Sequence, residues 1–167
     1  MVIATRLAAA LVAGAAMLGA AHIATAEESG SVRIIRTFVQ DYTTIEHGDS
    51  RYTGGPSEGS VTVLESSGGP FVEGTHQRIT CVVYAKSTEA GIDLDAPCTI
   101  TAPSGDTWYT HSKRRAGAVE AGGGGPGTME ILGGTGVYAG ISGSCTYDVG
   151  YMPDNWVATI ADCTWQR

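Results

Sequence analysis

Residues 133–151 read Gly-Gly-Thr-Gly-Val-Tyr-Ala-Gly-Ile-Ser-Gly-Ser-Cys-Thr-Tyr-Asp-Val-Gly-Tyr, a glycine-dense junction that leads directly into alternating polar and apolar residues. The alternation predicts a β-strand from Ser142 to Tyr151. A phosphate-binding glycine loop needs a helix after it, and a P-loop also needs a lysine. Because a strand follows and lysine is absent, we expect a turn between strands in which Gly136 or Gly140 adopts a positive φ.

The segment after the junction contains two cysteines placed symmetrically about a turn. Cys145 and Cys163 are equidistant from Asp154, which lies in the turn-forming stretch Met152-Pro153-Asp154-Asn155. Antiparallel pairing sets such residues opposite each other, with α-carbons about 4.5 Å apart at a non-hydrogen-bonded pair. A disulfide tolerates that distance. The spacing therefore predicts a hairpin joined by a Cys145–Cys163 disulfide.

The other two cysteines, Cys81 and Cys98, have the same symmetry about the polar connection Ser87 to Gly91. Four cysteines in an exported chain indicate two disulfides, and the spacing favours Cys81–Cys98 with Cys145–Cys163 among the three possible pairings. On the chain-entropy model each bridge contributes roughly 3 kcal/mol. A zinc site would need close pairs of the C-x-x-C kind. The sequence has none, and we expect neither a metal nor a cofactor.

The N-terminal stretch predicts export. Arg6 supplies a positive start, Leu7 to Ala21 is apolar and rich in alanine, and Ala24-Thr25-Ala26 is a small-x-small cleavage site. Removing residues 1–26 of the 167 leaves 141, which is enough for a single domain over 27–167. No later apolar run approaches the ~20 residues of a membrane helix. We expect a secreted or periplasmic protein after cleavage near Ala26.

The charge balance limits the partners. The chain has 10 basic and 17 acidic side chains, and without Arg6 the ratio is 9 to 17, a net charge of −8. This argues against nucleic acid and anionic membranes as partners. Lys113-Arg114-Arg115 is the only basic run, which we interpret as a solvated strand end. Glu46, His47 and Asp49 are interpreted as solvated loop residues, and no G-x-S-x-G elbow suggests a hydrolase.

The rest of the mature chain has an all-β pattern, with short alternating runs separated by Gly, Pro, Asn, Asp and Ser. We interpret His47 to Gly59 as a long loop or distorted strand, and Gly122 to Gly127 as a mobile loop. About eight antiparallel strands fit a sandwich or a closed barrel, and closure leaves no unpaired sheet edge. The expected strands are Val32 to Ile45, Ser60 to Ser66, Gln77 to Ser87, Ile92 to Ala102, Thr107 to Lys113, Thr128 to Leu132, Ser142 to Tyr151 and Trp156 to Trp165.

The junction Gly133 to Gly143 resembles the G-G-T-G-x-[YF]-x-G-x-x-G segment of the allene oxide cyclase-like and dirigent-like β-barrels. Met129 to Leu132 and the Ser104-Gly105-Asp106 turn fit the layout of bacterial members, and the match covers Thr99 onward. The resemblance implies a closed antiparallel barrel of about eight strands that holds a hydrophobic guest and steers a cyclisation or coupling. No catalytic residue of either family aligns with this chain, so the resemblance implies fold more than activity.

An eight-stranded barrel has an interior just wide enough for side chains or one small ligand. We expect any ligand site to lie inside and to be lined by aromatic residues, although the same residues could simply fill the core. Arg36 alternates with apolar residues and would face an anionic guest, or else point outward. The candidate ligand-binding residues are Tyr84, Trp108, Tyr147, Trp156 and Arg36.

The leading hypothesis is a secreted barrel that binds a small apolar or amphipathic molecule, with catalysis unproven and the oligomeric state unknown. One alternative is an interaction protein, such as an envelope-stress factor or enzyme inhibitor, which would use its loops and outer face over a solid core. Another is a cyclase or isomerase, with a polar group beside the guest. A cavity of about 300 Å³ or more would support binding. An interior ionisable group with a perturbed pKa would support catalysis.

Overall fold

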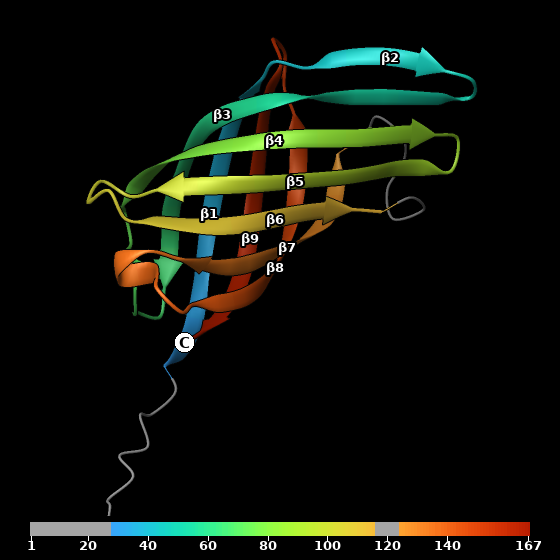
Figure 1. The fold of residues 1–167 in the computed structure, drawn as a ribbon. Helices are drawn as coiled ribbons and strands as arrows, with labels where there is room; N and C mark the ends of the chain where they lie inside the picture. Colours follow the sequence, from blue (N-terminus) through green and yellow to red (C-terminus); the bar gives the residue numbers. More distant parts are fainter. Residues whose placement is uncertain (1–27, 116–123) are drawn as a thin grey trace, which may run out of the picture.

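The computed structural model describes residues 28–115 and 124–167. The predicted signal peptide and its cleavage site fall on residues 1–27, outside the described residues. The described part contains nine strands and one short 3-10 helix, shown in Figure 1. These are β1 (Ser29–Gln40), β2 (Thr43–His47), β3 (Ser50–Ser66), β4 (His76–Thr88), β5 (Gly91–Thr101), β6 (Thr107–Arg114), β7 (Gly125–Gly134), η1 (Gly136–Tyr138), β8 (Ser142–Tyr151) and β9 (Trp156–Gln166).

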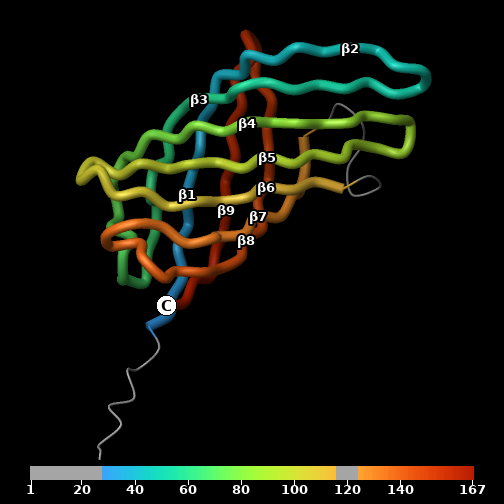
Figure 2. Tube along the Cα trace, viewed as in Figure 1, coloured from blue at the N-terminus to red at the C-terminus, as the bar shows by residue number. Residues whose placement is uncertain are grey.

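The strands form one antiparallel sheet that closes on itself. Neighbouring strands follow the order β1-β9-β8-β7-β6-β5-β4-β3-β2, and β1 also pairs with β3. Eight strands therefore make a closed barrel, while β2 lies outside it as a hairpin extension of β3 (Figures 1 and 2). The predicted all-β closed barrel is confirmed.

The predicted strand Val32 to Ile45 is in fact two strands. β1 ends at Gln40, and the chain turns before β2 begins. Both strands pair with β3, which changes its partner from β2 to β1 between Gly54 and Ser57. The interpretation of His47 to Gly59 as a loop or distorted strand missed that most of this stretch belongs to β3. A Cβ at Gly59 would overlap the backbone carbonyl of Thr37. Glycine there lets β1 and β3 approach closely enough to close the barrel.

The glycine signals are confirmed at the junction and partly wrong before β7. Gly136 and Gly140 adopt φ values of 53° and 77°, as predicted. Gly125 to Gly127 belong to β7 rather than to a mobile loop, while residues 122 and 123 lie outside the described residues. A Cβ at Gly127 would overlap the ring of Tyr147 on the neighbouring strand. This glycine therefore makes room for an interior aromatic side chain.

Both predicted disulfides are confirmed. Cys81 pairs with Cys98 and Cys145 with Cys163, each across a hairpin, with Cα–Cα distances of 4.1 and 4.0 Å. Asp154 and Asn155 have φ values of 58° and 62°. Two successive left-handed residues are what a tight hairpin turn requires. The predicted register around Asp154 is therefore correct.

One end of the barrel is filled by an aromatic cluster, which we define as Phe71, Trp108, Tyr138 and Trp165. The Phe71 ring lies 5.2 Å from that of Trp108 and 5.6 Å from that of Tyr138. Trp108 Nε1 donates to Gln77 Oε1 at 2.7 Å, and Gln77 Nε2 donates to the Tyr138 hydroxyl at 3.1 Å. The tyrosine of the glycine junction thus seals this end.

Candidate functional site

The opposite end of the barrel contains a partly open cavity. Its volume is about 70 Å³, and about 490 Å³ when the space out to the solvent opening is included. Along each strand the inward residues form successive layers. Arg36, Phe38 and Gln40 line the cavity from β1 in order from the interior to the rim. Tyr42 and residues from β3, β4, β5, β6, β8 and β9 complete the wall, and most of it is apolar.

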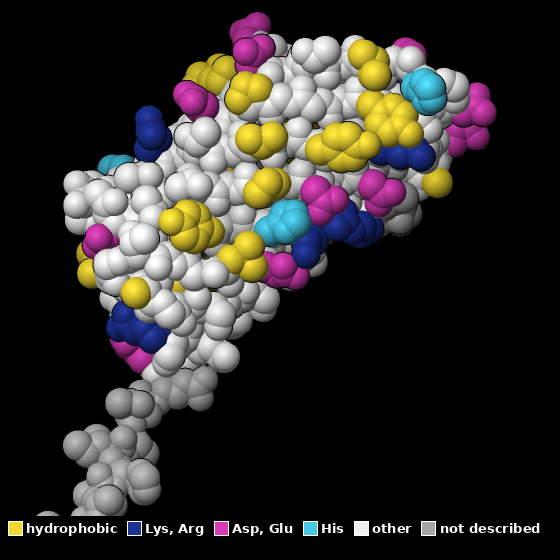
Figure 3. Space-filling view, viewed as in Figure 1, with side chains coloured by type: hydrophobic (Ala, Val, Ile, Leu, Met, Phe, Trp, Pro, Cys, Tyr) yellow, Lys and Arg dark blue, Asp and Glu magenta, His cyan; other side chains and the backbone are white. Residues whose placement is uncertain are grey.

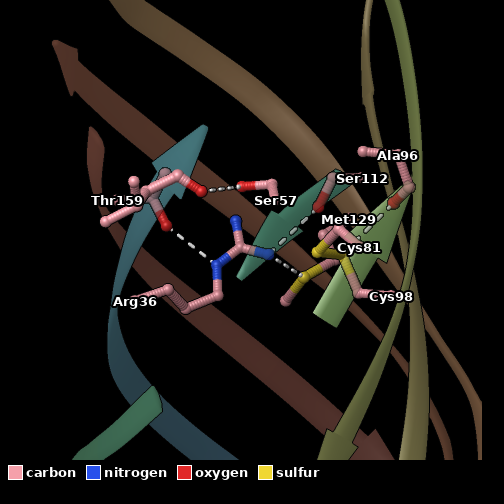
Figure 4. Close-up of a disulfide and its surroundings, with 9 residues drawn as sticks. Arg36, Ser57, Cys81, Ala96, Cys98, Ser112, Met129 and Thr159 are labelled. Carbon is pink, nitrogen blue, oxygen red and sulfur yellow. Dashed lines mark hydrogen bonds between the residues drawn. A yellow bond between two sulfur atoms is a disulfide. The ribbon is translucent and has the colours of Figure 1, made fainter. Parts of the chain in front are cut away.

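Arg36 occupies the inner layer of this cavity and is 2% exposed. Its Nε donates to Thr159 Oγ1 at 2.8 Å, and its Nη1 donates to Ser112 Oγ at 3.0 Å, with Met129 Sδ at 2.9 Å. Figure 4 shows the guanidinium held among these side chains beside the Cys81–Cys98 disulfide, with Nη2 joined to none of the residues drawn. Nothing in the described residues accepts a hydrogen bond from Nη2.

The positive charge of Arg36 has no acidic partner. Among the described residues, no buried side chain is a carboxylate. Burial in this apolar interior lowers the pKa of Arg36 to about 10, with a small opposing effect of Tyr147. The guanidinium therefore remains charged at neutral pH although desolvation disfavours the charge. The rings of Tyr147 and Phe38 lie 5.1 and 5.6 Å from its central carbon and provide cation–π contacts.

A second arginine, Arg114, lies nearer the rim. It is 3% exposed, and it donates to the Tyr151 hydroxyl at 3.2 Å and to the Gly124 carbonyl at 3.3 Å. The interpretation of this residue as part of a solvated strand end is wrong. Trp108, Thr110, Ser112 and Arg114 share one face of β6, so the period of two that buries Trp108 also turns Arg114 inward.

Tyr147 lines the cavity between the two arginines. Burial raises the pKa of its hydroxyl, while the positive charges of Arg36 and Arg114 oppose part of the rise. Its hydroxyl donates to the Lys113 carbonyl at 3.4 Å. The cavity thus combines guanidinium donors and a neutral phenol within apolar walls.

The five predicted ligand-binding residues lie in three different places. Arg36 and Tyr147 line the cavity, as the alternation along β1 and β8 allowed. Trp108 is inside the barrel but belongs to the aromatic cluster at the closed end. The expectation that Tyr84 and Trp156 line the interior is wrong, because they are 56% and 46% exposed. In both strands it is the other set of alternating residues that faces inward.

The remaining polar candidates lie outside the cavity. Glu46 and His47 are exposed, as expected, but they lie on strand β2 rather than in a loop. His111 Nε2 lies 3.1 Å from Asp95 Oδ1, and Arg115 also binds this carboxylate. The described residues contain no group of three His, Cys, Asp or Glu side chains that could hold a metal ion.

The outer face shown in Figure 3 has hydrophobic side chains scattered among polar ones. Within residues 28–115 and 124–167, no helix is long and apolar enough to cross a membrane. The two disulfides fit an extracellular or periplasmic protein. Comparison of the chain with known protein families and with curated proteins finds no match.

Proposed function

We propose that this protein binds a small amphipathic molecule at the open end of the barrel. The observation that carries the proposal is the cavity around Arg36, in which a buried guanidinium keeps an unused donor within apolar walls. A core whose only task is to stabilise the fold gains nothing from such a charge, since apolar replacement of buried ionic groups is often neutral or stabilising. A ligand that contacts both the guanidinium and the walls would account for both features.

The volume of the cavity limits how the guest is held. About 70 Å³ is far below the ~300 Å³ expected for a whole ligand site, and about half of the ~150 Å³ in which benzene binds. The enclosed space therefore fits a head group rather than a whole molecule. The body of the guest would occupy the wider opening, where Phe38, Val83 and Leu94 supply apolar contacts.

Two other functions compete with ligand binding. The solid core expected of an interaction protein agrees with the small enclosed volume. It does not explain why Arg36 carries a buried charge that has no acidic partner among the described residues. A cyclase or isomerase needs an acid or base that exchanges protons near neutral pH. The described interior supplies arginines, tyrosines and disulfide-bonded cysteines, and no buried carboxylate or imidazole. Binding without catalysis is therefore the proposal, and the relation to allene oxide cyclase-like barrels stays a prediction based on Gly133 to Gly143.

Native mass spectrometry of the protein purified from its own host tests this function. We expect a retained small molecule that dissociates when the protein is unfolded. In a second assay, the fluorescent apolar probe N-phenyl-1-naphthylamine is titrated into the wild type and two variants. Ala96→Phe fills the cavity, whereas Thr99→Phe adds the same ring to the outer face of the same strand.

We expect Ala96→Phe to lose probe binding and Thr99→Phe to retain it. Retained disulfides and an unchanged circular dichroism spectrum show that both variants fold. Absence of any retained molecule, together with probe binding that Ala96→Phe leaves unchanged, would contradict the proposed function and favour an interaction protein.

A further inference from the structure

The chemistry of the cavity restricts the kind of head group that it accepts. We propose that the head group is a carboxylate and that one of its oxygens accepts a hydrogen bond from Nη2 of Arg36. This inference rests on the binding function proposed above. The other polar atoms of this guanidinium already have partners: Nε donates to Thr159, and Nη1 donates to Ser112. Only Nη2 has donors available for a guest.

The charges around Nη2 favour a negative guest over a neutral or positive one. No Asp or Glu is among the described residues that line the cavity, while a second guanidinium, that of Arg114, lies nearer the rim. The attraction is therefore local, since the chain as a whole is acidic, with 17 acidic against 10 basic side chains. In a desolvated site, a charge acts far more strongly than it does at the solvated surface.

The polar side chains of the inner layer hold Arg36 in one orientation before a guest arrives. Thr159 on β9 and Ser112 on β6 bind the guanidinium from two sides of the barrel, and the Tyr147 ring packs against it from β8. A charged hydrogen bond to a guanidinium fixed in this way carries little additional ordering cost. The free Nη2 donor therefore constitutes a preorganised subsite.

The size of the enclosed space agrees with this head group. A carboxylate has three heavy atoms and occupies a small part of a cavity of about 70 Å³, so an apolar body can continue toward the opening. Tyr151 and Tyr42 lie at that opening, where aromatic side chains can contact the body of the guest. An organic monoanion with a compact or slender apolar body satisfies both parts of the site.

The experiment uses two pairs of probes that share their size and differ in charge, benzoate with benzamide and octanoate with octanamide. Each is titrated calorimetrically into the mature protein, into Arg36→Met and into Arg33→Met. Arg33 lies on the same strand but faces solvent, so Arg33→Met removes the same charge without altering the cavity. Arg36→Lys is the second cavity variant, which keeps the charge but loses the planar fork.

We expect the carboxylate of at least one pair to bind the wild type about tenfold to a hundredfold more tightly than its amide. Arg36→Met should remove this preference while leaving amide binding unchanged or stronger, Arg36→Lys should retain part of it, and Arg33→Met should retain all of it. Equal binding of acid and amide to the wild type, or a preference that survives Arg36→Met, would overturn the anion site and leave the proposed function standing. If none of the four probes bound, the proposed function itself would be contradicted.

Discussion

Replacing Arg36 by methionine should leave the stability of the protein nearly unchanged, although it alters one of the most buried side chains of the barrel. Large-to-small substitutions in a core usually cost 2 to 5 kcal/mol. Methionine, however, is unbranched and of similar length, and it removes a charge that has no acidic partner in the described interior. The size of the effect therefore distinguishes an uncompensated buried charge from an ordinary core residue.

The magnitude follows from the pKa of Arg36, which burial lowers by more than two units to about 10. At 1.36 kcal/mol per unit, the charged form costs the folded state about 3 kcal/mol. The substitution also removes the hydrogen bonds to Thr159 and Ser112, each worth about 1.5 kcal/mol because the donor is charged. The two effects nearly cancel, and the net expectation is a change of less than about 1 kcal/mol in the free energy of unfolding, or a shift in Tm of less than about 3 °C.

The pH dependence of the effect of Arg36→Met follows from the same shift. Because the pKa of Arg36 is lower in the folded state, the destabilising effect of its charge is fully present below pH 10 and disappears as the pH rises above that value. Urea unfolding with the disulfides intact should therefore give a constant difference between Arg36→Met and the wild type from pH 6 to 9. The control Arg33→Met should differ from the wild type by less than about 1 kcal/mol, because it removes only exposed ion pairs.

A loss of 2 kcal/mol or more in Arg36→Met would refute this reasoning, since it would mean that the charge is well compensated in the folded protein. A difference between variant and wild type that changes with pH between 6 and 8 would equally contradict the assigned cause.

Three further outcomes test other parts of the structure. Gly136→Ala should cost about 2 to 3 kcal/mol, because its Cβ would overlap the Asp106 carboxylate at a positive φ, whereas the Cβ of Gly140→Ala meets only Arg167 Cγ at 4.0 Å and the substitution should cost about 1 kcal/mol; equal Tm losses in thermal melts would contradict this order. Trp108→Phe should cost about 1 to 3 kcal/mol in urea unfolding by leaving Gln77 Oε1 without its donor, yet leave probe binding at the open end unchanged. Peptide mapping of the unreduced protein should yield only the two hairpin disulfides, and a peptide that joins cysteines of different hairpins would disprove the registers.

The features that the sequence predicted correctly depend on residues close together in the chain. Each disulfide follows from the symmetry of two cysteines about one turn, at sequence separations of 17 and 18. The positive φ values at Gly136 and Gly140 follow from a local need for residues without a Cβ. Such features require only the geometry of a hairpin or a turn, which the order of residues specifies directly.

The alternation of side chains was equally local, but it left one choice open. It showed that Tyr84 faces away from Val83 and that Trp156 faces away from Val157, without saying which of the two faces is interior. In β4 and β9 the valine face is buried, and the larger aromatic side chains are outside. That choice depends on how all eight strands close, because one register must bury the apolar faces of every strand at once.

The candidate site was decided by tertiary structure alone. The residues that hold Arg36 are 76 and 123 positions away in the chain, on strands that meet it only in the closed barrel. Pairing of β1 with β3 completes that closure, and it depends on the close backbone approach at Gly59. The sequence by itself determined most of the strands, the two disulfide-linked hairpins and their pairing of cysteines. Only the closed barrel decided that two arginines would lie inside it, because desolvation is a property of the assembled interior rather than of any single strand.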